Sequence, residues 1–280
     1  MNEGVHPLHY HIYDGNWHAI DAEIIAEAAL TLFVNGHELA SLMCTPRDPL
    51  QLAVGFLANE GFIKTLAEVE IAHICAGGGC ADMWLSHPVP TELPHKTITS
   101  GCSGGQTFAD LSVLMAPPEK ERSIDPDRLG ELIVRLQNQD SLYARARGVH
   151  TSALSDGKDL VVLAEDIGRH NTLDRLRGEC LLRGIDPSGM ILLSTGRISS
   201  EMIYKAALMG CPIVASRTSP TSLSVALARA WKITLCGYVR RSRMNVYACP
   251  ERLTGFQTSP DFFVLAPPAL AEHNRFGGED

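Results

Sequence analysis

The sequence predicts an α/β protein in two parts: a smaller α+β domain over residues 1–116 and a larger α/β domain over 117–280 with a mostly parallel sheet. Two observations carry this prediction. The first half reads as paired strands and turns with one inserted helix. In the second half, short apolar runs alternate with helical stretches, which is the pattern of βαβ units with helices packed on the faces of a parallel sheet.

Two hairpins are expected in the first part. The segment 28–44, "AALTLFVNGHELASLMC", has two β-rich runs around Asn35-Gly36, the strongest short hairpin signal. A second hairpin is expected to turn at the three glycines 77–79.

One helix is expected between these hairpins and another after them. In "RDPLQLAVGFLANEGFIK", Asp48 is a suitable N-cap, Pro49 fits the first helical position and Gly61 can end the helix. A polar linker, "PPEKERSI" (117–124), precedes a helix that begins at Asp125-Pro126. The apolar face of this second helix is formed by Leu129, Leu132, Ile133 and Leu136.

The strands expected in the second part are "LVVLAED", "MILLST", "PIVAS" and "ITLCGYV". Helical stretches are expected between them at about 171–183, 199–209 and 221–231, and Gly184 and Gly210 stand where helix C-terminal glycines belong. Ligands of such sheets bind beyond the carboxyl ends of the strands, and the polar motifs of this sequence fall there.

Composition sets the class of protein. The chain has 280 residues, 45% of them hydrophobic and 20% charged, with a formal net charge of −8. This acidic balance argues against broad nucleic-acid binding. No signal-peptide pattern and no apolar run long enough to cross a membrane is present, and the eight scattered cysteines form no disulfide framework, so a cytoplasmic protein is expected.

The motif "EDIGRHN" follows one predicted strand and opens a helix. Arg169, His170 and Asn171 bring a cation, a titratable ring and an amide to this junction, where free helical N–H groups suit phosphate or carboxylate. An ordinary helix cap beside a solvated arginine explains the same residues equally well.

The motif "STGRISSEMIYK" repeats this arrangement after the next strand. Ser194 and Thr195 offer hydroxyls, Gly196 permits close approach, and Arg197 offers a guanidinium fork for an anion. Two equivalent junctions that each carry an arginine favour a bound anion more than either does alone. Neither junction has the spacing of a P-loop or of a dinucleotide fingerprint.

A basic run lies in "GYVRRSRMNVY" between two strand-like segments. By itself it is typical of a solvated turn. Beside an anionic ligand it can hold phosphates, and the binding residues predicted there are Tyr238, Val239, Arg240, Arg241, Ser242 and Arg243.

Six of the eight cysteines fall into three kinds. Cys180, Cys211 and Cys236 lie in apolar runs and are expected to be buried. The pair in "CAGGGC" (75–80) lacks the further ligands that a zinc site needs, and His150 in "GVHTSAL" is interpreted as a local hydrogen-bonding histidine, so no metal is predicted. Cys102 in "TSGCSGGQTF" is sterically accessible among glycines, which suits a sulfur or acyl carrier as well as a loop cysteine without function.

Taken together, the motifs resemble one known family. "RDPLQLAVGFLANEGFI", "GVHTSAL", "EDIGRHNTLDRLRG", "STGRISSEMIYKAALMGCPIVASRTSPTSLSVALA" and "TLCGYVRRSRMNVYACPERL" occur in the order found in the formate dehydrogenase accessory sulfurtransferases of the FdhD family. The resemblance runs from about residue 20 to 255.

The resemblance implies a sulfur carrier. In this family a loop cysteine, here Cys102, takes sulfur from a cysteine desulfurase as a persulfide and passes it to the molybdenum or tungsten bis-guanine-dinucleotide cofactor of formate dehydrogenase. It also implies a homodimer, a C-terminal domain of three layers related to cytidine deaminases, and binding of GDP as a mimic of the cofactor. The phosphates of that cofactor give the three arginine-bearing segments a common purpose.

The sequence departs from the family at one position. Many members have Cys-x-x-Cys in the loop, whereas here Gly105 takes the place of the second cysteine, so Cys102 cannot pass its persulfide to a neighbouring thiol. A chaperone that binds and inserts the cofactor without sulfur chemistry is therefore the alternative function. A nucleotide hydrolase or deaminase is disfavoured, because the zinc motifs H-x-E and P-C-x-x-C are missing.

Overall fold

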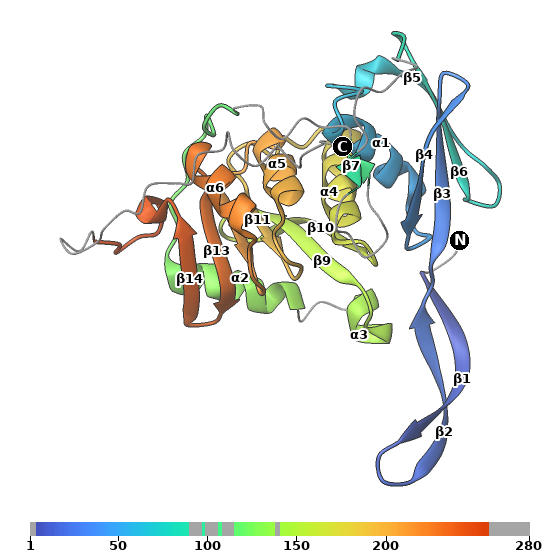
Figure 1. Cartoon of the computed structure of the whole chain (residues 1–280), viewed down its shortest axis with the longest axis horizontal. Helices are drawn as coiled ribbons and strands as arrows, with labels where there is room; N and C mark the ends of the chain where they lie inside the picture. The colour runs from blue at the N-terminus through green and yellow to red at the C-terminus, as the bar shows by residue number, and fades with distance from the viewer. Residues whose placement is uncertain (1–3, 90–96, 99–105, 108–114, 138–140, 258–280) are drawn as a thin grey trace, which may run out of the picture.

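The computed structural model describes residues 4–89, 97–98, 106–107, 115–137 and 141–257. Figure 1 shows three regions: a large α/β body, a smaller sheet with one helix beside it, and a long hairpin that projects from the base of that sheet.

The smaller sheet has four strands in the order β4-β3-β6-β5. Its antiparallel hairpins β3–β4 and β5–β6 are joined by a parallel pairing of β3 with β6. Both predicted hairpins are confirmed, and Asn35 and Gly36 turn the first with φ of 49° and 82°. The strands are β3 (Ala28–Val34), β4 (His37–Cys44), β5 (Val69–Ile74) and β6 (Cys80–Leu85).

Helix α1 (Pro49–Asn59) covers one face of this sheet, and its residues Leu52 and Phe56 share a core with the strands. Its predicted start at Pro49 is confirmed. Asp48 occupies the predicted N-cap position, but it has a left-handed backbone (φ 44°) and its side chain makes no capping hydrogen bond. The Asp48 carboxylate instead pairs with Arg47 at 3.3 Å.

The projecting hairpin, here called the arm, consists of β1 (Val5–Tyr13) and β2 (Trp17–Ile25). No sequence pattern predicted this hairpin. Its base is fixed by a small cluster in which Val5 packs with Leu142 and Val149. Leu142 belongs to the short helix α3 (Leu142–Ala146).

The large body contains a six-stranded sheet in the order β10-β9-β11-β12-β13-β14. The prediction of a mostly parallel sheet holds for its centre, where β11, β12 and β13 pair in parallel. The remaining pairings are antiparallel, so the sheet is mixed, because β9 inserts between β10 and β11 and β14 folds back as a hairpin. The strands are β9 (His150–Ser155), β10 (Leu160–Asp166), β11 (Ile191–Ser194), β12 (Ile213–Ser216), β13 (Thr234–Arg240) and β14 (Arg243–Ala248).

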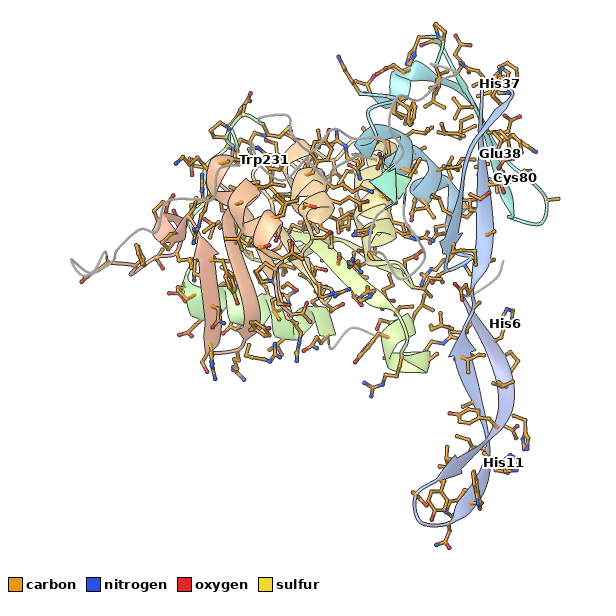
Figure 2. All side chains as sticks on the ribbon, in the orientation of Figure 1. His6, His11, His37, Glu38, Cys80 and Trp231 are labelled. Carbon is orange, nitrogen blue, oxygen red and sulfur yellow. A yellow bond between two sulfur atoms is a disulfide. The ribbon has the colours of Figure 1, made fainter. Side chains whose placement is uncertain are left out.

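Helices lie on both faces of this sheet, which makes three layers (Figure 1). One core joins the sheet to α4, α5 and α6 and includes Trp231, which is 1% exposed (Figure 2). The other core joins the opposite face to α2 through the predicted residues Leu129, Leu132, Ile133 and Leu136. The helices are α2 (Pro126–Gln137), α4 (Arg169–Arg183), α5 (Ser200–Leu208) and α6 (Ser222–Ala230).

The predicted helix ends are confirmed where the signals were local. Asp125 accepts hydrogen bonds from the N–H groups of Asp127 and Arg128 at 3.0 and 3.2 Å and so caps α2. Gly184 ends α4 with a left-handed φ of 65°. The remaining short elements are β7 (Thr97–Ile98), β8 (Gln106–Thr107) and the 3-10 helices Leu66–Glu68 and Pro250–Arg252.

Helices α1 and α4 cross in close contact through two glycines. A Cβ added to Gly55 would lie 1.6 Å from the Asp174 carbonyl oxygen, and one added to Gly178 would lie 1.9 Å from the Gln51 carbonyl oxygen. The smaller sheet with α1 is thereby packed directly against the large body.

Beside this crossing lies a buried polar cluster. Lys205 on α5, 2% exposed, pairs with Asp174 at 2.8 Å, Glu201 at 3.4 Å and Glu60 at 3.6 Å. Asn59, at the end of α1, donates to Asp174 at 2.7 Å. Burial by itself lowers the pKa of Lys205, but the three carboxylates outweigh burial and hold that pKa above its ordinary value.

Candidate functional site

The predicted binding segments meet at one edge of the six-stranded sheet. Strands β11, β12 and β13 are parallel, so their carboxyl ends lie together, with Ser194 beside Ser216. Strand β10 ends at this edge with Asp166, opposite His150 at the start of β9. The loops that follow four strands therefore face the same side of the molecule.

The first junction is largely buried. Arg169 is 3% and His170 7% exposed. The His170 ring faces Ser199 Oγ at 3.1 Å and Glu201 Oε2 at 3.4 Å. Asn171 donates to the Met43 carbonyl and to Asp166 Oδ1, both at 2.9 Å, so its amide links this junction to β4.

The second junction is fixed by hydrogen bonds of its own polar atoms. Ser194 Oγ accepts from Ser152 Oγ at 3.0 Å and from the Gly196 N–H at 3.1 Å. Thr195 Oγ1 accepts from the Thr151 N–H at 3.0 Å. These bonds fix the loop backbone, from which the exposed side chain of Arg197 extends.

Gly196 brings the two junctions together. A Cβ at this position would lie 3.0 Å from the Arg169 Cβ and 3.2 Å from His150 Nδ1. Any larger residue would push these side chains apart, so glycine here is required by the close approach.

The third segment places its residues in different surroundings. Arg240 Nη1 donates to the Arg217 carbonyl at 2.8 Å, which brings it to the shared edge. Tyr238, 46% exposed, donates its N–H to Thr218. Val239 lies in the core against α2. The exposed hairpin turn that follows contains Arg241, Ser242 and Arg243.

Two further residues of this edge were not predicted. Arg217 follows β12, and burial together with Arg240 lowers its pKa. His150, which was interpreted as a local hydrogen-bonding residue, lies beside Arg169 and Arg197, and burial together with these cations lowers its pKa. Arg217 could have been found by the rule used for the other two junctions, since it too directly follows a strand.

The edge is therefore cationic in an acidic chain. Arg169, Arg197, Arg217 and Arg240 approach it from four different segments, with His150 among them. Such an arrangement suits an extended anion with several phosphates.

Cys102 lies outside the described residues. The two strands on either side of it are paired antiparallel, Thr97 with Thr107 and Ile98 with Gln106. The described free cysteines are Cys44, Cys180, Cys211, Cys236 and Cys249.

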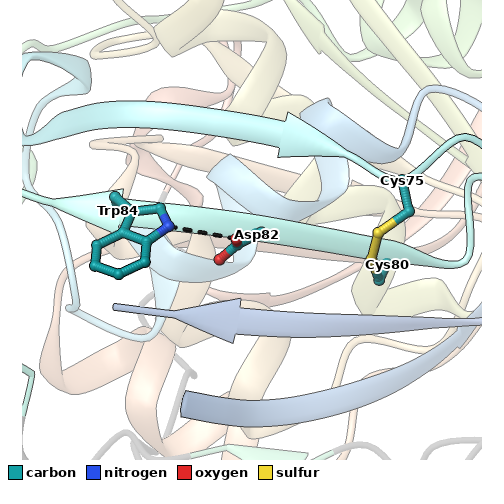
Figure 3. Close-up of a disulfide and its surroundings, with 4 residues drawn as sticks. All are labelled: Cys75, Cys80, Asp82 and Trp84. Atoms are coloured by element: carbon teal, nitrogen blue, oxygen red, sulfur yellow. Dashed lines mark hydrogen bonds between the residues drawn. A yellow bond between two sulfur atoms is a disulfide. The ribbon is translucent and has the colours of Figure 1, made fainter. Parts of the chain in front are cut away.

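Cys75 and Cys80 are joined in a disulfide at the end of the β5–β6 hairpin (Figure 3). In the same figure, the Trp84 indole N–H donates to Asp82 at 3.3 Å. The described residues contain no group of three or more metal-ligating side chains, and the absence of a metal stays a prediction. In the same part of the chain, no helix combines the length and hydrophobicity needed to span a membrane.

Comparison with known proteins gives a consistent result. Residues 25–254 match the model of the FdhD/NarQ family. The sulfur carrier protein FdhD of Staphylococcus aureus strain MRSA252 is 35% identical over 246 residues, which cover 86% of this chain and 92% of the relative. The same protein of strain RF122 / ET3-1 is 34% identical with the same coverage.

A solved structure supports the fold. The crystal structure of a formate dehydrogenase accessory protein from Desulfotalea psychrophila aligns with a TM-score of 0.72 and 28% identity, covering 89% of this chain and 99% of that one. The matched segments include all three arginine-bearing motifs of the sheet edge. The chain belongs to the FdhD/NarQ family.

Proposed function

We propose that this protein is a sulfur carrier required for formate dehydrogenase activity. Cys102 accepts sulfur from a cysteine desulfurase as a persulfide and transfers it to the molybdenum or tungsten bis-guanine-dinucleotide cofactor. Family membership and the names of the relatives support the general role. The observation that carries the proposal is the convergence of four arginines on one sheet edge.

The cofactor is the substrate that fits this edge. Its two pyrophosphates need several cations and N–H donors in a row, and Arg197, Arg217 and Arg240 come from three consecutive strand ends. Gly196 leaves room for close approach of a phosphate to the backbone. GDP carries one guanine and one diphosphate and so serves as a mimic.

The described free cysteines are poorly suited to carry sulfur. Burial raises the pKa of Cys180 to about 11 and that of Cys44 and Cys236 to about 12. It also raises the pKa of Cys211 and Cys249. The thiolate is the attacking species, so these groups are unreactive at neutral pH, which supports the assignment to Cys102.

The transfer uses ordinary thiol chemistry. The Cys102 thiolate attacks the outer sulfur of the donor's persulfide, the donor thiolate leaves, and Cys102 holds the sulfur until the acceptor takes it. Since Gly105 replaces the second thiol, no internal disulfide releases the sulfur prematurely. The proposal includes action in the cytoplasm as a homodimer that binds the desulfurase and the catalytic subunit of formate dehydrogenase.

The experiment replaces the proposed carrier. Cys102→Ser removes the thiolate and leaves a nearly isosteric hydroxyl, and Cys249→Ser, at a half-buried cysteine, is the matched control. In cells lacking the native factor, formate dehydrogenase activity is expected to be lost with Cys102→Ser and kept with the control. Because the replacement is nearly isosteric and the sequence predicts an accessible glycine-rich loop around Cys102, folding stability is expected to change by no more than about 0.5 kcal/mol.

Two further measurements complete the test. After incubation with desulfurase and cysteine, mass spectrometry should find one added sulfur on wild type and none on Cys102→Ser, while both bind GDP equally. Full formate dehydrogenase activity with Cys102→Ser would overturn sulfur transfer and favour the cofactor-binding chaperone.

A further inference from the structure

A disulfide closes the turn of the β5–β6 hairpin in the smaller sheet. Cys75 directly follows β5 and Cys80 begins β6, and their Cα atoms are 5.3 Å apart (Figure 3). The turn also has hydrogen bonds of its own. The Cys75 N–H donates to the Cys80 carbonyl at 3.0 Å, and the Gly78 N–H donates to the Cys75 carbonyl at 2.7 Å. The turn is therefore held without the S–S bond, which can open and close while the hairpin is kept.

This disulfide contributes little to the stability of the fold. A cross-link stabilises a protein mainly by restricting the unfolded chain, and this effect is smallest when the closed loop is short. Here the bonded residues are separated by five positions. The strand that follows is already anchored in the core of the smaller sheet by the fully buried Ala81 and Met83. A chemical role explains the S–S bond better than a structural one.

The sulfur atoms lie in a turn that leaves space around them. Cys75 and Cys80 are half-buried, and Gly77 and Gly79 between them are exposed. A Cβ added at Gly77 or Gly78 would meet no atom within 4 Å. Thiol–disulfide exchange needs a thiolate to reach one of the two sulfur atoms, so this open turn permits the reaction.

A cavity of about 660 Å³ lies between this turn and the chain that leads into α1, and α3 contributes to its wall. Small-molecule sites have volumes of about 300–1,000 Å³. Of the two bonded cysteines, Cys75 is the one that lines the cavity. A ligand in the cavity is therefore next to one particular sulfur of the disulfide.

The charged residues of the cavity indicate the class of ligand. Its cations are Arg47 and Arg145, and its carboxylate is Asp48. Arg47 and Asp48 pair at 3.3 Å with both side chains about half exposed, and exposed pairs of this kind are weak enough to exchange with a ligand. Glu23 bonds Arg145 at 2.7 and 2.9 Å and so fixes the orientation of its guanidinium. Since a guanidinium has five N–H donors, it can bind a second carboxylate at the same time.

Two guanidiniums and one carboxylate suit a ligand with two carboxylates and one ammonium group. Glutathione, a peptide thiol, has this set of charges, whereas a single amino-acid thiol such as cysteine lacks the second carboxylate. The nearby cations also favour the thiolate form of a bound thiol, which is the form that attacks a disulfide.

We propose that the cavity binds an anionic peptide thiol, which opens the Cys75–Cys80 disulfide by forming a mixed disulfide with Cys75. The peptide thiolate attacks Cys75 Sγ, a new S–S bond forms as the old one breaks, and Cys80 leaves as a thiolate that takes a proton from water. A second peptide thiolate then attacks the sulfur of the bound peptide and releases Cys75 as a thiol. Two peptide thiols are thereby oxidised to one disulfide, and the protein disulfide receives their two electrons. This reaction goes beyond the proposed function and does not depend on Cys102.

The first experiment compares a charged thiol with a neutral one on the full-length protein. Glutathione and 2-mercaptoethanol reduce the disulfide, and alkylation followed by mass spectrometry of the peptides containing Cys75 and Cys80 gives the rates. Arg47→Gln is expected to slow the reaction with glutathione about fivefold and to change the reaction with 2-mercaptoethanol by no more than about twofold. The matched control is Arg229→Gln, at an exposed arginine on α6, which is expected to change neither rate.

The second experiment identifies the sulfur that the peptide reaches. Cys80→Ser leaves Cys75 as a thiol, Cys75→Ser leaves Cys80, and each variant is treated with glutathione disulfide. The mixed disulfide is expected to form at Cys75 at least about tenfold faster than at Cys80, because only the first sulfur belongs to a residue that lines the cavity. Peptide mapping separates these adducts from any adduct at Cys102.

Each outcome decides the inference. If Arg47→Gln slows both thiols equally or slows neither, the cavity does not select an anionic thiol and the proposal is overturned. Equal rates at Cys75 and Cys80, or wild-type protein that keeps both thiols free in glutathione disulfide, overturn it as well. The first experiment keeps both cysteines, so it decides the matter even where a serine variant fails to fold. None of these results bears on sulfur transfer by Cys102.

Discussion

At the level of single residues, the sheet edge combines exposed and buried cations with different roles. Arg197 is exposed and extends from a fixed loop, whereas Arg169 is buried beneath it beside Gly196. The exposed guanidinium is free of the packing constraints of the core and can turn toward an anion. Arg169 instead adds positive electrostatic potential from its buried position beside Gly196, where water screens its charge less.

Arg197→Ala is therefore expected to weaken GDP binding about tenfold, the effect of losing one charge-assisted hydrogen bond. Calorimetric titration measures the affinity. The matched control is Arg183→Ala, which removes one exposed arginine at the opposite end of α4. Equal affinity of wild type and Arg197→Ala would remove Arg197 from the site.

His170 makes stability depend on pH. Burial, with Lys205 and Arg169 nearby, lowers its pKa from 6.5 to about 3. Between these values the unfolded chain binds a proton that the folded chain does not, so the free energy of unfolding falls as the pH falls below 6.5. The slope from one such group is at most about 1.4 kcal/mol per pH unit.

His170→Gln is expected to flatten this decline between pH 6.5 and about 5, a range above the ordinary pKa values of carboxylates. Urea unfolding at several pH values gives the slopes. The same slope in variant and wild type would show that His170 is not the group that titrates.

At the level of elements, the crossing of α1 and α4 depends on glycine for contact. The backbones approach so closely at Gly55 and Gly178 that a methyl group on either one would overlap the other helix. The buried cluster around Lys205 lies beside this crossing and adds directional bonds to it. The glycine contacts and the buried ion pairs together fix the position and orientation of α1 against the large body.

Gly178→Ala is expected to lower the free energy of unfolding by about 2 kcal/mol or more, because the helices must move apart. Gly77→Ala is the control, since a Cβ there meets no atom within 4 Å. Thermal and denaturant unfolding measure both variants. If the two behaved alike, the crossing would be more tolerant than its geometry indicates.

The elements that the sequence predicted correctly are those specified by neighbouring residues. Asn35-Gly36 predicted a hairpin turn, and both residues have the positive φ that this turn requires. The helical spacing of apolar residues predicted the buried face of α2. Strand β9 has serine and threonine at buried positions, which only non-local bonds such as Ser152 to Ser194 and Thr172 can satisfy. Its place between β10 and β11 made the sheet mixed and could not be deduced from neighbouring residues.

Local sequence signals also predicted part of the candidate site, and the remainder depends on distant elements. Strand-to-helix junctions placed Arg169 and Arg197 correctly at one edge, because parallel strands end together. The sequence could not tell that Asn171 bonds to β4 or that Val239 packs on α2, since both depend on distant elements. The arm escaped prediction because Pro7 and its histidines interrupt an otherwise regular alternation.

At the scale of the whole molecule, the two parts share a large contact. The predicted boundary at 116/117 would place α1 and α4 in different domains, and yet these helices are packed at backbone contact. Because the two parts meet at backbone contact and share buried ion pairs such as Lys205 with Asp174 and Glu60, we expect them to unfold together.

Calorimetry is therefore expected to show one cooperative transition for the whole chain, with equal calorimetric and van't Hoff enthalpies. Two resolved transitions would mean that the smaller sheet with α1 melts independently. The Gly178→Ala variant sharpens this test, because loosening the crossing should begin to separate the transitions.

The tryptophans of this chain sit in three unlike surroundings. Trp231 is 1% exposed in the core of the large body, Trp84 is 43% exposed on the smaller sheet, and Trp17 is 72% exposed at the tip of the arm. The protein thus contains its own optical reporters. A quencher dissolved in the buffer reduces the emission of Trp17 and Trp84 more than that of Trp231. The quenched fraction of the emission therefore reports on the arm and the smaller sheet, and the fraction that remains reports on the core of the large body.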